Sequence, residues 1–357
     1  MILIILALVI VLYCAQAWTL RNAMTGIRYR SDCSELLVEP DTKFDLITTV
    51  SNRSRRFIPF LRLEELLPPE SEVHVEKAIL RRSYMQELRL VTTVYLMPKS
   101  SVKRHVCISL PARGRYQFRG ANMRVGDFLG LTETSEYIGS LNEIIVYPKA
   151  VPKPSVDDML GGFLGEISAR RFILEDPVLA VGAREYTGRE PMKNISWNHS
   201  ARLGKLMVRQ FDYTIEPSVT VMLDMNIFST EKDESALMEN CFSLARSVCM
   251  VLEERGFRYD FITNATTANA VARWSYMAEG LGARHYYAIL EGMGRASLGS
   301  TESFGATMTR VIGRREQNKA MIIITPDRAE EKKRLADRQQ AQNGGKTIIL
   351  YGEDITT

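Results

Sequence analysis

The sequence has little of the chemistry on which most enzymes depend. It contains four histidines, His74, His105, His199 and His285, and their spacing is not that of a metal site. Its five cysteines form no Cys-x-x-Cys pair, which excludes the common zinc and redox motifs. There is no Gly-x-Ser-x-Gly nucleophile elbow. We therefore expect no catalytic residues and a protein that is not an enzyme.

The excess of positive over negative side chains is also small. The 46 Lys and Arg residues and 42 Asp and Glu residues leave a formal net charge of +4. A nucleic-acid-binding protein needs a concentrated basic face, so no nucleic acid is expected as a partner. The one local basic cluster is Arg53, Arg55 and Arg56. It fits a solvated turn, or alternatively a contact with acidic lipid headgroups.

The longest apolar run stands at the amino terminus. Met1–Trp18 has no charged side chain, and this length just suffices to cross a bilayer. Arg21 and Arg28 follow closely, so the positive-inside rule predicts a transmembrane helix over 1–19. The chain would then be a single-pass protein of the cell membrane with its main body in the cytoplasm. Ala15-Gln-Ala17 leaves open a cleaved signal peptide and an exported envelope protein.

Residues 31–150 are predicted to form an all-β sandwich domain. Short apolar or alternating runs, separated by turn-forming residues, are typical of such a domain. The predicted strands are Leu36–Val38, Phe44–Val50, Phe57–Leu63, Leu88–Leu96, Val106–Leu110 and Glu143–Pro148.

The remainder of the chain follows a proline-rich connector at Ala150–Ser155. Residues 151–217 are predicted to be a linker and a signature segment, with irregular structure over Asp157–Pro177. Strands and helices then alternate over 218–357, which predicts a parallel sheet covered by helices. The predicted strands are Ser218–Asp224, Phe257–Thr263, Ala320–Thr325 and Lys346–Tyr351. The predicted helices are Asp233–Glu254, Ala283–Met293, one capped by Ser300 or Thr301, and a charged, solvated one at Glu330–Gln342.

The most specific pattern of the chain lies in residues 184–209. It resembles the signature Arg-x-Tyr-x-x-Gly-Asp-x-x-Arg-x-Ile-x-Trp-x-x-Ser-Ala-Arg of a bacterial family, domain of unknown function 58. The family's Gly-Asp pair is Arg189-Glu190 here, and its glycine is displaced to Gly188. The matching residues are Arg184, Tyr186, Ile195, Trp197, Ser200, Ala201 and Arg202, with Arg209 further along in register.

This resemblance implies a fold class, a partner and a set of contact residues. The fold class would be an α/β von Willebrand factor type A-like domain with a Rossmann-like parallel sheet, preceded by the all-β sandwich and the N-terminal transmembrane helix. The partner would be a MoxR-type AAA+ ATPase. Tyr186 and Trp197 are expected to pin the segment onto the sheet. The residues expected to carry the signature or to bind the partner are Arg184, Tyr186, Trp197, Ser200, Arg202 and Arg209.

The resemblance also points to a degenerate metal site. Type A domains often bind a divalent cation through Asp-x-Ser-x-Ser after the first strand, with a distant acid. Here the motif reads Asp224-Met-Asn226-Ile-Phe228, and Asp327 stands where the distal acid would lie. A bound Mg²⁺ needs oxygen ligands, and Phe228 offers none. Alternatively, Asp224 caps a helix or pairs with a nearby arginine. No other cofactor is expected.

The leading hypothesis is a membrane-anchored, non-enzymatic interaction or scaffold protein. It would work with the ATPase in the assembly or maintenance of envelope or metalloprotein complexes, docking around Asp224, Asn226 and the 184–209 segment. One alternative is a divalent-cation-dependent enzyme at the sheet crevice near Asp224. The other is an exported, cleaved envelope protein.

Overall fold

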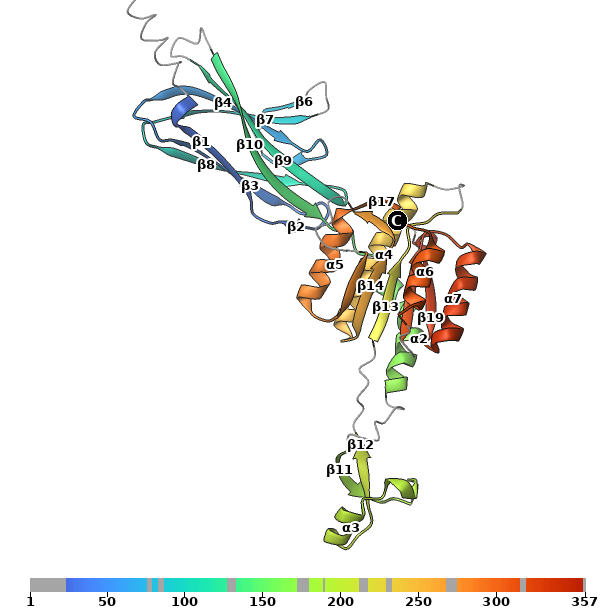
Figure 1. Cartoon of the computed structure of the whole chain (residues 1–357). Coiled ribbons are helices and arrows are strands. Elements are labelled where there is room, and N and C mark those ends of the chain that lie inside the picture. The colour runs from blue at the N-terminus through green and yellow to red at the C-terminus, as the bar shows by residue number, and fades with distance from the viewer. Residues whose placement is uncertain are drawn as a thin grey trace, which may run out of the picture. The chain divides into compact units, whose positions relative to one another are not determined.

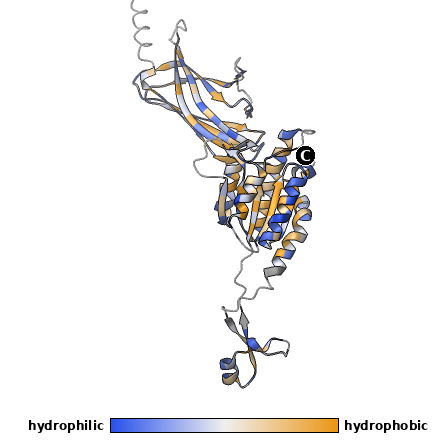
Figure 2. Ribbon diagram, turned by 45° about the vertical axis from the view of Figure 1, so that its right-hand side comes forward, coloured by the Kyte–Doolittle hydropathy of each residue, from blue (hydrophilic) through white to orange (hydrophobic). Residues whose placement is uncertain are grey.

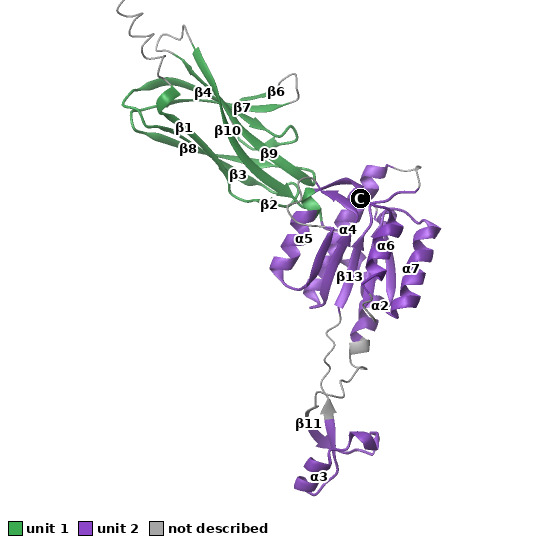
Figure 3. Ribbon diagram, in the orientation of Figure 1, with its two compact units in different colours: residues 1–149, 293–295 green, residues 150–292, 296–357 purple. Residues whose placement is uncertain are grey.

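In the computed structural model the chain divides into two compact units (Figure 3). The first comprises the residues up to Lys149 together with Met293–Arg295, and the second comprises Ala150–Gly292 and Ala296–Thr357. The structure describes residues 24–75, 79–82, 87–126, 133–171, 180–188, 190–211, 218–228, 233–267, 275–314 and 319–355.

The first unit is a sandwich of two β-sheets (Figure 1). After a short 3-10 turn, Met24–Gly26, one sheet has the strand order β1-β3-β8-β5 and the other β2-β10-β9-β4-β7-β6. The strands of the first sheet are β1 (Ile27–Cys33), β3 (Phe44–Asn52), β8 (Ser101–Ser109) and β5 (Glu72–Val73). Those of the second are β2 (Leu37–Val38), β10 (Glu133–Val146), β9 (Gly114–Gly126), β4 (Ile58–Leu67), β7 (Leu88–Leu96) and β6 (Ile79–Arg82).

Strict alternation of buried side chains places the sandwich core. Every second residue of β3 is buried, so Phe44, Leu46 and Val50 point between the sheets. They belong to two separate apolar clusters: Leu46 packs with Leu67 of β4 in one, and Val50 packs with Leu63 in the other. The inward-facing residues between these pairs are polar, so a buried polar layer interrupts the core.

That polar layer is built around Glu65. This side chain on β4 is 1% exposed, and it reaches the opposite sheet. Thr48 and Arg104 donate to it, and the Tyr29 hydroxyl donates to Oε1 at 3.4 Å. Burial raises the pKa of Glu65 against the lowering effect of Arg104 and of the donated hydrogen bonds.

The second unit contains a five-stranded mixed sheet of order β16-β14-β13-β18-β19. Its central strands are strongly apolar, as their orange colour in Figure 2 shows. The strands are β16 (Tyr276–Gly280), β14 (Arg258–Thr263), β13 (Ser218–Leu223), β18 (Ala320–Thr325) and β19 (Thr347–Tyr351). The long helices are α2 (Lys153–Arg171), α4 (Glu234–Glu254), α5 (Ala283–Arg295), α6 (Phe304–Ile312) and α7 (Glu330–Asn343).

Helices cover both faces of this sheet. Phe304 and Met308 of α6 and Ala336 of α7 pack against Met222 and Ile323 on one face. On the other face, α4 contacts β13, β14 and β18 (Figure 1). A separate two-stranded ladder pairs β15 (Ala265–Thr267) with β17 (Ala296–Ser300), and a short 3-10 turn, Gly352–Asp354, follows β19.

The fold class predicted from the sequence is wrong. Of the described residues, 44% lie in strands and 32% in helices, and they form no clear von Willebrand factor type A core. The sheet of the second unit is not the fully parallel one expected, because β16 runs antiparallel to β14. The connection between these two strands contains the short strand β15, and antiparallel neighbours need no helical crossover. What does hold is the parallel pairing of β13 with β18, with Leu223 opposite Ile324.

The single-pass membrane localisation is corrected as well. No helix among the described residues is long and apolar enough to cross a membrane. The predicted transmembrane segment, 1–19, lies outside the described residues.

The irregular structure predicted for Asp157–Pro177 is wrong, because helix α2 runs to Arg171. Three glycines obscured a real apolar stripe, since Val156, Leu160, Phe163 and Ile167 are all buried at helical spacing.

Candidate functional site

Two carboxylates meet at the carboxyl edge of the sheet of the second unit. Asp224 directly follows β13, and Asp327 follows the neighbouring strand β18. Because these strands are parallel and adjacent, both chains turn away from the sheet at the same edge. Asp224 is 0% exposed and Asp327 is 2% exposed. The sequence analysis expected these two residues together because of the resemblance to type A domains.

Asp224 is fully committed to neighbours within the protein. Its Oδ1 accepts from Asn264 Nδ2 at 2.7 Å, from Asn226 Nδ2 at 3.1 Å and from the Asn226 backbone N–H at 3.2 Å. Its Oδ2 accepts from the Thr325 hydroxyl at 3.0 Å. Its two oxygens therefore accept four hydrogen bonds from groups of the same unit.

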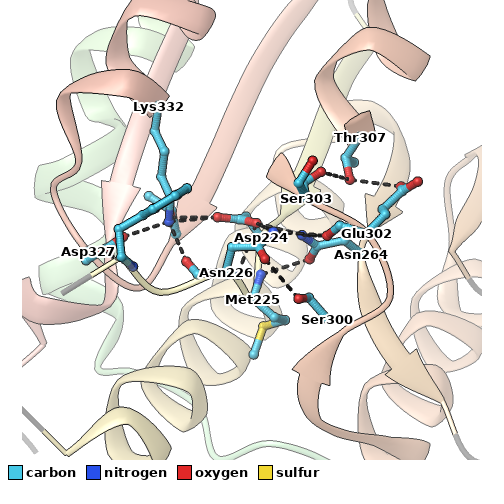
Figure 4. Close-up of polar contacts among 12 residues, drawn as sticks. Asp224, Met225, Asn226, Asn264, Ser300, Glu302, Ser303, Thr307, Asp327 and Lys332 are labelled. Carbon is cyan, nitrogen blue, oxygen red and sulfur yellow. Dashed lines mark hydrogen bonds and ion pairs between the residues drawn. The ribbon is translucent and has the colours of Figure 1, made fainter. Parts of the chain in front are cut away.

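Lys332 supplies the positive charge of the cluster (Figure 4). Its Nζ lies 2.9 Å from Asp224 Oδ2 and 2.6 Å from Asp327 Oδ1. It also donates to the Thr325 hydroxyl at 2.6 Å and to the Asn226 carbonyl at 2.5 Å. The side chain is 1% exposed and comes from the first turn of α7.

Asn226 turns its side-chain oxygen away from the lysine. That oxygen accepts from the Ser300 hydroxyl at 2.9 Å, while the side-chain amide donates to Asp224 and to the Glu302 carbonyl. The predicted metal residues Asp224, Asn226 and Asp327 are therefore together, but around an ammonium group. Elsewhere in the described residues, no group of three or more His, Cys, Asp or Glu side chains could hold a metal ion.

Two aromatic rings lie over the buried ammonium. The Phe228 ring centroid is 5.2 Å from Lys332 Nζ, and the Phe304 centroid is 5.9 Å away. The Phe228 backbone N–H also donates to Asp327 Oδ2 at 2.7 Å. Phe228, which has no oxygen to offer a metal, is thus suited to an ammonium, since aromatic faces attract cations.

The sequence analysis missed Lys332 because it treated 330–342 as a solvated helix. That interpretation is wrong for one face of α7: Lys332, Ala336 and Gln339 are all buried. Their spacing of four and three residues is the signal that could have identified this face.

The signature segment forms a small unit of its own, residues 180–211. Strands β11 (Ala180–Glu185) and β12 (Met207–Phe211) pair antiparallel, and between them lie a 3-10 turn (Met192–Asn194) and helix α3 (Trp197–Leu203). Gly204 ends α3 in the left-handed region at φ 63°, which favours glycine. Among the described residues, the hydrogen bonds and ion pairs of this segment all stay within it.

Several signature residues hold this small unit together. Arg184 pairs with Glu190 at 2.7 Å, and Glu190 accepts from the Thr187 hydroxyl at 2.8 Å and its backbone N–H at 3.1 Å. These contacts, led by the Thr187 hydroxyl, lower the pKa of Glu190 to about 2. The Ser200 hydroxyl accepts from the Met207 N–H at 2.8 Å and so ties α3 to β12. The Tyr186 N–H donates to the Leu206 carbonyl at 2.8 Å.

Other signature residues face solvent. Trp197 is 65% exposed, so it does not pin the segment onto the sheet as expected. Arg202 and Arg209 are exposed as well. His199 is exposed and meets the Ser196 hydroxyl at 2.9 Å, and no carboxylate contact completes a triad within the described residues. Three more large apolar side chains of this segment are exposed: Met192, Leu203 and Leu206.

The segment also carries the net charge of the chain. Residues 180–211 contain six Lys or Arg and two Glu, a net charge of +4, which equals the formal net charge of all 357 residues. The rest of the chain is therefore balanced. The segment joins the sheet through 212–217, at the amino end of β13, whereas Asp224 follows its carboxyl end. Among the described residues, the hydrogen bonds and ion pairs of Asp224 do not reach this segment.

No known family model matches the chain, and no curated protein matches it by sequence. Among solved structures, it is similar to the CARDB domain of the PF1109 protein from Pyrococcus furiosus, with 14% identity over 34% of this chain and 85% of that one and a TM-score of 0.21. It is also similar to a cohesin module from a Clostridium perfringens family 33 glycoside hydrolase, with 10% identity over 34% and 96% and a TM-score of 0.24. The sixth cohesin of Acetivibrio cellulolyticus scaffoldin B gives 10% identity over 33% and 98%, with a TM-score of 0.24. These β modules correspond to about a third of the chain, and the likeness is too low to carry an argument about function.

Proposed function

We propose that this chain is a non-enzymatic interaction protein that binds a partner polypeptide through the segment 180–211. A MoxR-type AAA+ ATPase is the partner that the resemblance to domain of unknown function 58 implies. Binding to such an ATPase would serve the assembly or maintenance of larger protein complexes. No catalytic residue takes part in this proposal.

The observation that carries the proposal is the exposed surface of the segment. Trp197, an aromatic residue of the type that anchors protein interfaces, is 65% exposed on a unit of only 32 residues. Monomeric proteins seldom leave several large apolar side chains exposed together without a function. The surrounding Lys and Arg side chains would steer the segment toward a partner with an acidic rim.

The internal stiffness of the segment favours the same role. The Ser200 hydroxyl joins α3 to β12, and the Thr187–Glu190 contacts fix the turn after β11. A preorganised contact surface loses less conformational entropy on binding than a disordered one. The shape of the segment is therefore maintained by its own contacts before any partner arrives.

The carboxyl edge of the sheet is less suited to bind a partner. Its carboxylates and its lysine are buried and paired with one another, so they offer no free charge at the surface. The same pairing gives no support to the alternative of a cation-dependent enzyme at Asp224.

The experiment measures binding of the full chain to a purified MoxR-type AAA+ ATPase by titration calorimetry. Trp197→Ala should weaken binding by about 2 kcal/mol or more, the range of an interface hot spot. Arg202→Glu with Arg209→Glu should weaken it further and reduce the dependence of the association rate on salt.

Matched control variants test whether the loss of binding is specific to this surface or follows from removing any exposed aromatic or positive side chain. Tyr95→Ala removes another aromatic side chain, 63% exposed, on the sandwich. Lys103→Glu with Lys333→Glu makes the same change in net charge at exposed positions elsewhere. Wild-type affinity in the Trp197 and arginine variants, or equal losses in the controls, would refute the proposed contact surface.

A further inference from the structure

We infer that Lys332 is a built-in cation: its ammonium group occupies the position at which this edge of the sheet would otherwise hold a divalent metal ion. Four oxygen atoms converge on its Nζ at 2.5–2.9 Å. They belong to Asp224, Asn226, Thr325 and Asp327, which follow or end two parallel strands. Carboxylate, hydroxyl and carbonyl oxygens are the ligands of hard divalent cations.

The position of Lys332 in α7 is unfavourable to a positive charge, so its burial there depends on the neighbouring carboxylates. It lies in the first turn of α7, where the helix dipole is unfavourable to a positive charge. Ala329, at the N-cap, has no side chain that could satisfy the first N–H groups. The pairing with Asp224 and Asp327 is the main interaction that offsets the cost of burying the ammonium at this point.

The ammonium also leaves no open coordination position. Its three N–H groups donate to Asn226, Thr325 and Asp327, and Asp224 Oδ2 lies 2.9 Å away. The side chain is 1% exposed, with the rings of Phe228 and Phe304 over its Nζ. A partner could not add a carboxylate to this centre as it could to an incompletely coordinated metal ion. The inference therefore predicts that the wild-type chain folds and binds its partner without divalent cations.

Truncating the lysine should turn the cluster into a metal site. In Lys332→Ala the oxygens remain and space is left for an ion with water. Their spacing around Nζ is nearer to calcium–oxygen distances, about 2.3–2.6 Å, than to magnesium–oxygen distances, about 2.0–2.1 Å. Calcium should therefore bind more tightly than magnesium.

The test uses the full chain with CaCl₂ or MgCl₂ alone as the probe. For Lys332→Ala, calcium at about 100 times its Kd should raise the melting temperature by about 5–10 °C, and a chelator should reverse the shift. Lys332→Met removes the charge but fills the space, so it should show no shift, and neither should Lys332→Ala combined with Asp327→Asn. A saturable calcium shift in the wild-type chain would overturn the inference, as would a folded Lys332→Ala variant that responds to neither ion.

A measurement on the wild-type chain keeps the inference testable if these variants do not fold. Reductive methylation with formaldehyde and a borane reductant modifies accessible amines, and peptide mapping by mass spectrometry reads each site. Lys332 should react at least about tenfold more slowly than its exposed neighbour Lys333, because a buried group reacts only through local opening. Equal rates at Lys332 and Lys333 in the folded chain would contradict the built-in cation.

Discussion

Each of the two units buries a charged cluster, and the two clusters are built differently. In the sandwich, Glu65 lies between the sheets and meets Arg104, whose side chain is 25% exposed. At the edge of the mixed sheet, Lys332, Asp224 and Asp327 are all at most 3% exposed. The first cluster joins two sheets through a partly solvated arginine, and the second holds all its charges away from water.

The difference shows what each cluster contributes. Glu65 interrupts an apolar core and lies where two β-sheets must align, so it specifies how the sheets register rather than adding much stability. The Asp224 cluster instead links β13 to β18 and the start of α7, which lie much later in the sequence. Breaking it exposes uncompensated charge in the interior, which is the costly case.

The largest expected effect breaks the fully buried cluster. Lys332→Met leaves two buried carboxylates without their counter-charge, so the free energy of unfolding should fall by about 3–5 kcal/mol. Urea unfolding measures the loss, and hydrogen exchange of β13 and β18 peptides localises it to the second unit. The control Lys333→Met, at an exposed neighbour, should change stability by less than about 0.5 kcal/mol. Equal effects of the two substitutions would contradict the comparison.

A matched pair of threonines sharpens the comparison. Thr325 donates to Asp224 and accepts from Lys332, whereas the buried Thr48 donates to Glu65. Each Thr→Val substitution removes a hydrogen bond to a charged group, with a cost of about 1.5–3 kcal/mol. Thr325→Val should have the larger cost, because two contacts are lost. Urea unfolding of both variants checks the order, and a larger loss in Thr48→Val would reverse our interpretation.

The Glu65 cluster should make the free energy of unfolding depend on pH. Its pKa is raised above the ordinary value of 4.5, so the folded state holds this proton more tightly than the unfolded state. The stability it contributes is therefore fully present below pH about 4.5 and is lost as pH rises through the folded pKa. Glu65→Gln should remove this decline, seen as a flatter profile of unfolding free energy against pH. If the unfolding free energy of the wild-type chain instead rose with pH above about 4.5, relative to that of Glu65→Gln, the prediction would be wrong.

The smallest effect lies in the segment 180–211. Glu190 should titrate at a pKa of about 2, and Thr187→Ala should raise that value toward 4.5, because the Thr187 hydroxyl is its main cause. Since the pKa is lowered in the folded state, this contribution is present above pH about 4.5 and is lost as pH falls through about 2. Carboxyl chemical shifts from NMR measure both values. If the pKa of Glu190 were unchanged in Thr187→Ala, the Thr187 hydroxyl would not be the cause of its low value.

Part of this structure could be predicted from the sequence, and the reasons are local. Leu88–Leu96 was predicted with the observed bounds of β7, and Asp233 caps α4 as expected, accepting from the Ser235 N–H. The meeting of Asp224 with Asp327 was instead implied by the resemblance to type A domains. The strand bounds and the helix cap depend on hydrophobic periodicity and on capping residues, and a short stretch of sequence is enough to determine both.

What could not be predicted depends on contacts between distant residues. The residues around Lys332 in the sequence are mostly charged and give no indication that Asp224 is its partner. Lys332 was therefore interpreted as part of a solvated helix. The helix over 300–313 is capped by Ser303 rather than by Ser300 or Thr301, because Ser300 ends β17 and binds Asn226. Trp197 was expected to be buried on general grounds, yet the small unit around it offers no core large enough to cover it.

The attachment of the segment 180–211 has a mechanical consequence. Tension applied to it enters the sheet at Ser218, the first residue of β13, and runs along that strand. Because β13 is paired in parallel with β14 on one side and β18 on the other, its ladders would have to slide as a whole before the strand could leave. A motor that pulls on this segment from its carboxyl side would therefore load β13 along its length, against the ladders on both of its edges.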